Sequence, residues 1–173
     1  MRKLLNSELN RPDIDTFKNA DKHPIIVVLD NVRSLNNVGS VFRTSDAFNV
    51  QSIYLCGITA TPPNKEIHKT ALGAENSVEW KYFETTELAL QQLKSEGYTI
   101  ASIEQAENSV LLNKLNIDAI KKLAVVFGNE VEGVAQNIVS SSDMVIEIPQ
   151  WGTKHSLNIS VSVAVVLWEL VRG

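Results

Sequence analysis

The stretch LDNVRSLNNVGSVFRTSDAF, residues 29–48, passes from the end of an apolar run into a polar loop and then into an amphipathic segment. The preceding residues, 25–29, are isoleucine, valine and leucine, as is typical of a buried strand. Residues 38–48 place four apolar side chains near one stripe of a helix, namely Val38, Val41, Phe42 and Phe48. This order predicts one strand–loop–helix unit of an α/β fold.

The same alternation continues along the chain. Apolar runs that favour strands lie at residues 25–29, 52–55, 78–83, 99–103, 123–127 and 144–148. Helical spacing lies between them, at residues 86–96 and 131–140, with Thr85 as a cap for the first of these and Gly97 as its stop. Strands that alternate with helices predict a mainly parallel sheet with helices on both faces.

The last segment, residues 157–171, reads at first as a strand, because Ile159, Val161 and Val163 alternate with serines. Its apolar run continues to Leu170, which is too long for a typical strand, so we predict a helix. This helix is apolar on nearly every side and must be buried all round. In a domain of this size, we expect one of its faces to meet another subunit.

The composition is that of an ordinary globular chain. Its 173 residues fit one domain, and 44% are hydrophobic. The single Cys56 excludes an internal disulfide, and the three histidines lack metal-ligand spacing, so no metal is expected. The start has no apolar signal core, and no segment is long enough to span a bilayer. We therefore expect a cytoplasmic enzyme or binding protein.

The formal net charge of −4 argues mildly against a nucleic-acid partner. Position matters more than the sum, because six cationic or imidazole side chains fall in loops or at helix starts. They are Arg33, Arg43, Lys65, Lys69, Lys154 and His155. Each of them, taken alone, also reads as ordinary surface charge.

Three polar loops stand where a parallel sheet binds its ligands, beyond the carboxyl ends of strands. They lie in residues 29–48, in VVFGNEVEGVAQ (125–136) and in the polar half of IPQWGTKHSLNISVSVAVVLWEL (148–170). No glycine-rich dinucleotide fingerprint follows the first strand, and Val134 stands where a phosphate-binding loop needs lysine. We expect the three loops to converge on one pocket of another kind.

Single residues in these loops have both a structural and a functional interpretation. Asn37 is placed to cap a helix that starts near Val38, and Arg43 lies about 140° around that helix from Val38, so both side chains are expected to face the crevice. Glu130 and Glu132 sit at a helix start, where the dipole stabilises a carboxylate by about 0.3–1 kcal/mol. Ser156 is placed to cap the last helix.

Three stretches together resemble a known family. NNVGSVFRTSDAF, LAVVFGNEVEG and IEIPQWGTKHSLNISVSVAVVLWE are similar to the three motifs of the SpoU class of SPOUT RNA methyltransferases, in the right order. The resemblance runs from about residue 24 to the end. HKTALGAENSVEW (68–80) and ASIEQAENS (101–109) resemble the branch that methylates the ribose of a D-loop guanosine in tRNA.

The resemblance implies an α/β fold with a C-terminal trefoil knot, in residues 24–173, after an N-terminal extension, 1–23, that we expect to be helical. It implies a homodimer that methylates a ribose 2′-hydroxyl of RNA, with tRNA favoured and rRNA the other candidate. S-adenosylmethionine would be held by Ile103, Phe127, Gly128, Ile148, Ser156 and Leu157. The catalytic set would be Arg43 with Asn37, Glu130, Ser156 and Asn158, and the RNA contacts Arg33, Arg43, Lys154 and His155, with Arg43 completing the partner's site.

A guanidinium is always charged, so Arg43 suits a phosphate and a developing alkoxide better than the role of base. The proton would pass to the phosphate, to water or to Glu130, which alternatively fixes Arg43 by an ion pair. Two other readings stay open: a catalytically idle RNA-binding module on the same fold, and a flavodoxin-like nucleotide or flavin binder on an unknotted sheet. The sequence leaves the target RNA, the nucleotide and the proton acceptor open.

Overall fold

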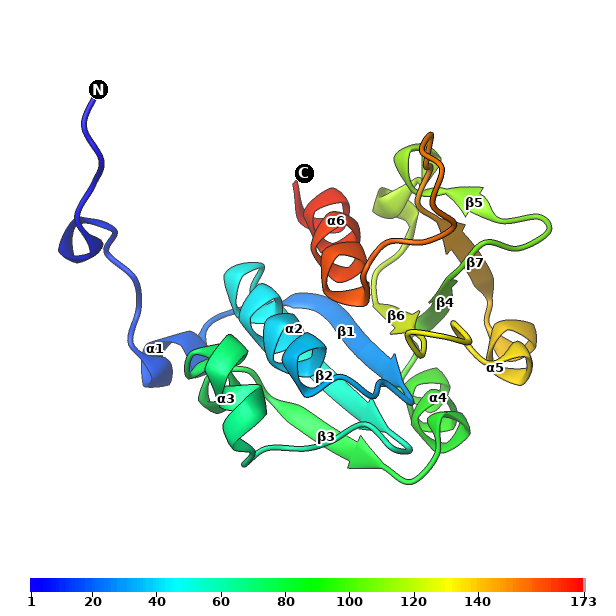
Figure 1. The fold of residues 1–173 in the computed structure, drawn as a ribbon, viewed down its shortest axis with the longest axis horizontal. Coiled ribbons are helices and arrows are strands. Elements are labelled where there is room, and N and C mark those ends of the chain that lie inside the picture. The colour runs from blue at the N-terminus through cyan, green and yellow to red at the C-terminus, as the bar shows by residue number, and fades with distance from the viewer. Residues whose placement is uncertain (173) are drawn as a thin grey trace.

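The computed structural model describes residues 1–172, apart from the side chain of Asp118. Its centre is a seven-stranded sheet in the order β3-β2-β1-β6-β4-β7-β5, in which every neighbouring pair is parallel (Figure 1). The strands are β1 (His23–Asp30), β2 (Val50–Cys56), β3 (Trp80–Phe83), β4 (Thr99–Ile103), β5 (Val110–Leu111), β6 (Leu123–Phe127) and β7 (Met144–Glu147). The predicted parallel α/β sheet is confirmed.

Helices cover both faces of the sheet, as predicted. The α-helices are α1 (Ile14–Asn19), α2 (Leu35–Ala47), α3 (Lys65–Ala71), α4 (Thr86–Ser95), α5 (Gln136–Ser141) and α6 (Ile159–Val171). Short 3-10 turns lie at Asn6–Glu8, Ala74–Asn76, Leu112–Lys114 and Ile117–Ala119. Buried side chains of α2, α3 and α6 share one hydrophobic cluster with the sheet, and those of α4 and α5 share the other.

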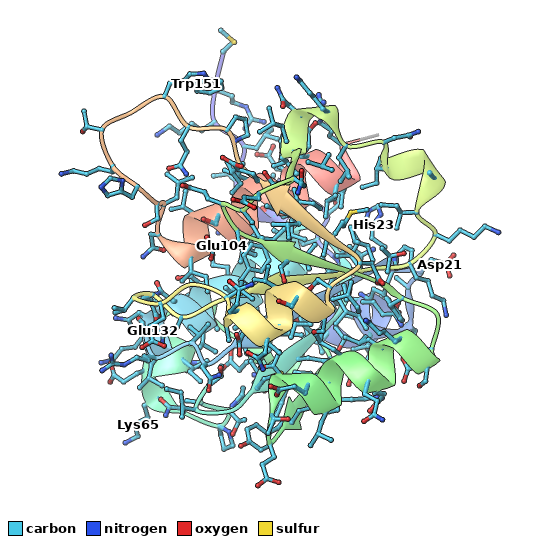
Figure 2. All side chains as sticks on the ribbon, turned by 90° about the vertical axis from the view of Figure 1, so that its right-hand side faces the viewer. Asp21, His23, Lys65, Glu104, Glu132 and Trp151 are labelled. Carbon is cyan, nitrogen blue, oxygen red and sulfur yellow. The ribbon has the colours of Figure 1, made fainter. Side chains whose placement is uncertain are left out.

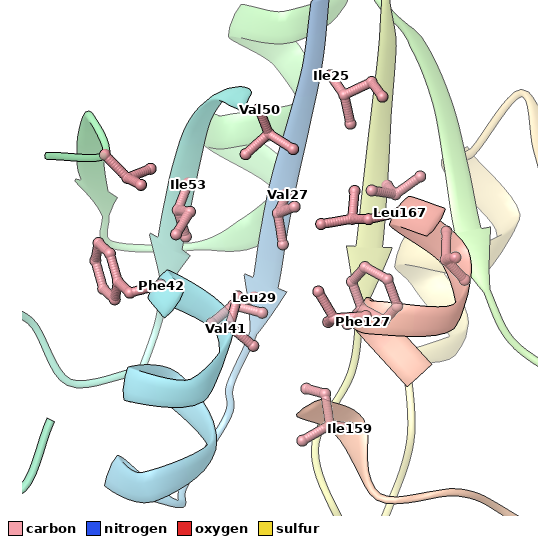
Figure 3. Packing of buried hydrophobic residues seen from close by; sticks show 14 of the residues in the cluster. Ile25, Val27, Leu29, Val41, Phe42, Val50, Ile53, Phe127, Ile159 and Leu167 are labelled. Atoms are coloured by element: carbon pink, nitrogen blue, oxygen red, sulfur yellow. The ribbon is translucent and has the colours of Figure 1, made fainter. Parts of the chain in front are cut away.

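The side chains of β1 alternate between the two faces of the sheet, so this strand contributes to both hydrophobic clusters. Ile25, Val27 and Leu29 join the cluster under α2 and α6, as Figure 3 shows. Ile26 and Val28 join the opposite cluster, because successive side chains of a strand point to opposite faces. Burying each of these side chains contributes about 1.5–3 kcal/mol, which makes β1 a strongly determined element.

The N-terminal caps of α2 and α6 are not the residues that the sequence predicted. Ser34, rather than Asn37, caps α2, since its side chain accepts from the backbone N–H of Asn37, and the helix begins at Leu35. Asn158, rather than Ser156, caps α6, because its Oδ1 accepts from the N–H of Ser160 at 2.9 Å. In both cases a neighbouring polar side chain does the capping.

The boundaries of α4 agree with prediction and those of α5 do not. Thr85 caps α4 by accepting from the N–H of Leu88 at 3.3 Å, and Gly97 follows its end with φ +82°. The helix predicted from residue 131 begins only at Gln136, because residues 129–133 close into a turn of their own. The short β5 and α3 were not predicted.

The last segment is a helix, as predicted, but this chain alone does not bury all of it. Val161, Val165 and Trp168 remain 47%, 38% and 58% exposed, respectively. They lie on one stripe of α6, opposite the buried Val163, Val166 and Leu167. The ring of Trp168 lies 6.2 Å from that of Phe48, which extends the apolar surface onto the end of α2.

The N-terminal residues run outward from the sheet in Figure 1. Residues 14–19 form α1, whose Phe17 carbonyl accepts from Lys22 Nζ at 2.6 Å. The same ammonium donates to Asn49 Oδ1 at 2.8 Å, which ties α1 to the turn after α2. Over the residues that the structure describes, none of the helices is long and apolar enough to cross a membrane.

Candidate active site

A cavity of about 1110 Å³ opens at the carboxyl ends of β4, β6 and β7. Three segments far apart in the sequence line most of it: residues 103–107, residues 127–134, and a third segment made of Ile148, Gln150 and residues 155–159. Parallel strands end at one edge of their sheet, so the loops that follow β4, β6 and β7 meet there. This is the place where ligands bind in open parallel sheets.

All six residues expected to hold the cofactor line this cavity. Ile103, Phe127 and Ile148 supply apolar wall at or just beyond the strand ends, and Gly128 supplies bare backbone. Ser156 and Leu157 enter from the loop before α6. The catalytic candidates Glu130 and Asn158 line the cavity as well, and so does His155.

The turn at 129–133 is fixed by its own hydrogen bonds. The backbones of Asn129 and Gly133 exchange two bonds of 2.9 Å, and Asn129 Oδ1 accepts from the N–H of Val131 at 2.9 Å. Asn129 Nδ2 also donates to the carbonyl of Asn31 at 2.9 Å, which joins the turn to the loop after β1. The turn is therefore a rigid wall of the cavity.

Gly128 is required by close packing in this wall. A Cβ placed there would fall inside 3.0 Å of backbone atoms of Gly133 and Val134, closer than real side chains approach. Gly133 itself has φ +71°, a conformation that favours glycine. Both glycines are thus explained by geometry at the mouth of β6.

A chain of hydrogen bonds links the loop after β1 to the two other motifs. Asn158 Nδ2 donates to Asn37 Oδ1 at 3.2 Å, and Asn37 Nδ2 donates to Glu130 Oε1 at 2.9 Å. The carboxylate of Glu130 also accepts from the backbone N–H groups of Ser34, at 2.9 Å, and Arg33, at 3.0 Å. Three catalytic candidates, Asn37, Glu130 and Asn158, are therefore in direct contact.

The surroundings of Glu130 keep it ionised. Partial burial raises the pKa of this carboxyl, but the hydrogen bonds from Arg33, Asn37 and Ser34 outweigh that effect and leave the pKa below its usual value. A carboxylate with a lowered pKa is a weak proton acceptor. Its contacts instead tie the β6 turn to the start of α2, where the helix dipole also favours a negative charge.

Arg43 does not share this arrangement within one chain. It is exposed on α2, lies outside the cavity and makes no hydrogen bond or ion pair to the described residues. The expectation that Asn37 and Arg43 face the same crevice of one chain is wrong, because the helix turns them to different sides. The alternative ion pair between Glu130 and Arg43 is likewise not formed within the described part of the chain.

The remaining RNA candidates lie around the rim. Lys154 and His155 are exposed on the loop before α6, and His155 also lines the cavity. Arg33 lies apart from them, in a smaller pocket of about 420 Å³ that shares the turn residues Asn129 and Glu132 with the cavity. Of the predicted RNA-binding residues, His155 is therefore the one that lines the cavity, and Arg33 lies in the neighbouring pocket.

Two residues of the cavity were missed by the sequence analysis. Glu104 accepts from the N–H of Val134 at 3.1 Å and from that of Gln105 at 2.9 Å, and Gln105 Nε2 donates to the carbonyl of His155 at 2.6 Å. In Figure 2, Glu104 lies between the turn that carries Glu132 and the loop that carries Trp151. Their position directly after the strand ending at Ile103 was the available signal.

No group of three or more His, Cys, Asp or Glu side chains among the described residues is placed to hold a metal ion.

Comparison with known proteins identifies the family. The model of the SpoU rRNA Methylase family matches residues 24–168, most of the chain. The chain is 32% identical over 160 residues to the 23S rRNA (guanosine-2'-O-)-methyltransferase RlmB of Neisseria meningitidis, which covers 91% of this chain and 62% of that protein. This chain belongs to the SpoU family.

Two further relatives extend the comparison. The tRNA (guanosine(18)-2'-O)-methyltransferase of Aquifex aeolicus is 32% identical over 151 residues, which are 86% of this chain and 69% of that protein. The crystal structure of an AdoMet-bound rRNA methyltransferase from Sinorhizobium meliloti matches with a TM-score of 0.81 and 25% identity, over 90% of this chain and 59% of that one. The chain thus spans only about three fifths of the Neisseria and Sinorhizobium proteins.

Proposed function

We propose that this member of the SpoU family methylates a ribose 2′-hydroxyl of RNA with S-adenosylmethionine, and that tRNA is favoured over rRNA. The main support for the proposal is the cavity at the edge of the sheet. All the residues expected to bind the cofactor line it, and two of its other lining residues, Asn158 and Glu130, are both hydrogen-bonded to Asn37. Relatives that methylate guanosine ribose in tRNA and in rRNA support the reaction and leave the choice of RNA to experiment.

The residues of the cavity fit the proposed cofactor. Ile103, Phe127 and Leu157 offer apolar surface for an adenine ring, and Glu104 and Gln150 offer polar groups for a ribose or an amino acid. The missing side chain at Gly128 lets the backbone of Gly133 and Val134 pack against it, which shapes this wall of the cavity. When bound, S-adenosylmethionine supplies an activated methyl group.

The chain's own groups then have to position the ribose. Asn37 and Asn158 hold each other's amide groups in fixed directions at the mouth of the cavity, and Glu130 fixes Asn37 in turn. Such preorganised orientation is worth about 7–11 kcal/mol in a reaction between two bound groups. Both carboxylate oxygens of Glu130 already accept from N–H groups of Arg33, Ser34 and Asn37, so we give Glu130 the role of orienting Asn37, and the hydroxyl proton passes to the substrate phosphate or to water.

Arg43 acts in this scheme from a second copy of the chain. It would hold the phosphate next to the target ribose bidentately and stabilise the alkoxide that develops. The exposed apolar stripe of α6, with Val161, Val165 and Trp168, supports a homodimer, because a soluble helix rarely leaves such side chains in water. Phe48, at the end of α2, lies beside Trp168 of the same chain, so a dimer through this stripe would bring the end of α2 to the interface.

The remaining features of the family complete the proposal. We assign the trefoil knot to the C-terminal part, on the strength of the strand order and the TM-score. Residues 1–23 would be an extension to a methyltransferase domain at 24–173, and the protein would act in the cytoplasm.

The first test is incubation with isotope-labelled S-adenosylmethionine and total RNA, followed by mapping of the labelled nucleotide. We expect a 2′-O-methylated nucleotide in tRNA. Arg43→Ala should abolish methylation and leave affinity for S-adenosylhomocysteine unchanged. A fully active Arg43→Ala protein would remove Arg43 from the mechanism.

A second test asks whether Arg43 acts across subunits. Arg43→Ala and Asn158→Ala subunits, each inactive alone, should recover activity when mixed, because one site of the mixed dimer keeps both residues. Failure to recover activity would place Arg43 and Asn158 in the same chain's site. Absence of S-adenosylhomocysteine binding by calorimetry would favour the idle RNA-binding module instead.

A further inference from the structure

Two tryptophans are largely exposed, and their surroundings differ. Trp168 is 58% exposed on α6, beside Phe48 and on the same apolar stripe as Val161 and Val165. Trp151 is 89% exposed and lies far out on the loop before α6, as Figure 2 shows. The indole of Trp168 therefore belongs to an apolar surface of the kind that binds another protein. The indole of Trp151 does not belong to such a surface.

The chain around Trp151 is polar and cationic. Residues 151–158 are all exposed, and Lys154 and His155 follow Trp151 within this segment. Four residue steps separate Trp151 from His155, so the two lie at most about 14 Å apart. This upper limit lets one RNA strand contact both the indole and the two side chains that are expected to meet phosphate.

Residues before and after Trp151 in the sequence line the cavity. Gln150 and His155 line the cavity, whereas Trp151 is not among its lining residues. Gln105 Nε2 donates to the carbonyl of His155 at 2.6 Å, which holds this part of the loop at the rim. The indole thus stands beside the mouth of the cavity, outside the cofactor's place.

An exposed indole beside cations matches an unpaired nucleobase. Bases stack on aromatic rings whatever their sequence, and the flanking phosphates pair with lysine or protonated histidine. A paired base in a duplex has no free face to offer, so the partner must contain a single-stranded stretch. A protein partner fits less well, because the other large apolar side chain exposed within residues 151–158, Leu157, lines the cavity.

We infer that Trp151 stacks on an unpaired base of the substrate RNA, next to the nucleotide whose ribose enters the cavity, while Lys154 and His155 contact the adjoining phosphates. This inference rests on the proposed function. Trp151 is then a positioning residue, which holds the strand and leaves the chemistry to the groups in the cavity.

The test compares Trp151→Ala, Trp151→Phe and Tyr82→Ala. Tyr82 provides the matched control, because it is an exposed aromatic residue, at 51%, on the distant edge strand β3. Binding is measured to a labelled hairpin RNA with an unpaired loop and to a blunt duplex of the same length. Affinity for S-adenosylhomocysteine and the oligomeric state are measured on the same proteins.

Trp151→Ala should weaken binding of the hairpin about 5- to 150-fold, which is the loss of one base stacked on an aromatic ring. Trp151→Phe should retain most of the affinity, and Tyr82→Ala all of it. Duplex binding, S-adenosylhomocysteine affinity and oligomeric state should stay unchanged in every variant. In methylation assays with tRNA, Trp151→Ala should raise KM and leave kcat close to wild type.

Other outcomes overturn the inference in separate ways. Equal hairpin affinity of Trp151→Ala and wild type would show that the indole does not stack. A lower affinity of Trp151→Ala for S-adenosylhomocysteine would make Trp151 part of the cofactor site, and a changed oligomeric state would make it part of a protein interface. If wild type bound neither tRNA nor the hairpin, the proposed function itself would fail.

Discussion

Two walls of the same cavity are built in opposite ways. The turn at 129–133 is closed by two backbone hydrogen bonds, and Asn129 and Glu130 connect it to the loop after β1. On the other side, the wall is part of the loop at residues 151–157, of which His155, Ser156 and Leu157 line the cavity. This loop is exposed throughout, and the one hydrogen bond described for it joins His155 to Gln105. The turn is therefore a preformed wall, and the loop is a wall that few hydrogen bonds hold in place.

The difference assigns different tasks to the two walls. A preformed wall keeps its shape without a ligand, so cofactor binding there does not have to order the chain. A sparsely bonded loop adapts to a large partner at the cost of ordering it on binding. Substitutions in the turn should therefore change stability and cofactor affinity, and substitutions in the outer part of the loop, residues 151–155, should change RNA binding.

The largest expected effect is the difference in stability between two glycine-to-alanine substitutions, one in the turn and one in the loop. Gly128→Ala should destabilise the protein by about 1–3 kcal/mol and weaken S-adenosylhomocysteine binding, because backbone at Gly133 and Val134 has to move. Gly152→Ala should change stability by less than about 0.5 kcal/mol, since nothing lies within 4 Å of its Cβ position. Urea denaturation and calorimetry measure both, and equal effects would refute the contrast between the walls.

The next effect concerns the charge that anchors the turn. Glu130→Gln should destabilise the protein by about 1 kcal/mol at neutral pH, because the carboxylate accepts bonds from Arg33, Ser34 and Asn37. Its pKa is lowered on folding, so this stabilisation is full above the usual carboxyl pKa and is lost as the pH falls through the lowered value. Urea denaturation across acidic pH should show wild type approaching the variant. A difference that does not change with pH would mean that the charge plays no part.

A smaller effect separates the two candidate caps of α6. Asn158→Ala should cost about 0.5–2 kcal/mol, because Asn158 accepts from the N–H of Ser160 and also holds Asn37. Ser156→Ala should cost less than about 0.5 kcal/mol, because Ser156 is exposed and makes no hydrogen bond within the described chain. Thermal unfolding of the two variants gives the comparison. The reverse order would restore Ser156 as the cap.

The smallest effect on stability should come from the single bond of the loop. Gln105→Ala removes the side chain that holds the His155 carbonyl, and should change the free energy of unfolding by less than about 0.5 kcal/mol. Tryptic cleavage after Lys154 should nevertheless become faster, because the loop loses its one described hydrogen bond, while amide exchange of the turn at 129–133 stays the same. Unchanged cleavage would show that other contacts hold the loop.

Local pattern was sufficient for much of the architecture. Alternation of strand and helix predicted the parallel sheet, and Thr85 and Gly97 marked the two ends of α4. The unbroken apolar run predicted α6, which the structure confirms. These features depend on residues within a few positions of one another, so their spacing is enough.

Features that depend on a distant partner were predicted poorly. β5 is two residues long and exists by pairing with β7, where Val110 faces Ile146. The helix expected from residue 131 begins only at Gln136, because hydrogen bonds between the backbones of Asn129 and Gly133 hold the preceding residues in a turn. Asn37 was expected to cap its own helix, and its amide is instead committed to Glu130 and Asn158.

The sequence by itself determined most of the strands and helices and many of the polar residues at the strand ends, because hydrophobic period and capping residues act locally. Only the tertiary structure decided which of those residues meet. Asn37 and Asn158 are 121 positions apart and touch, while Arg43 and Asn37 share one helix and point apart. The physical reason is that the order of strands in the sheet sets the neighbours of each loop, and that order is settled by long-range packing.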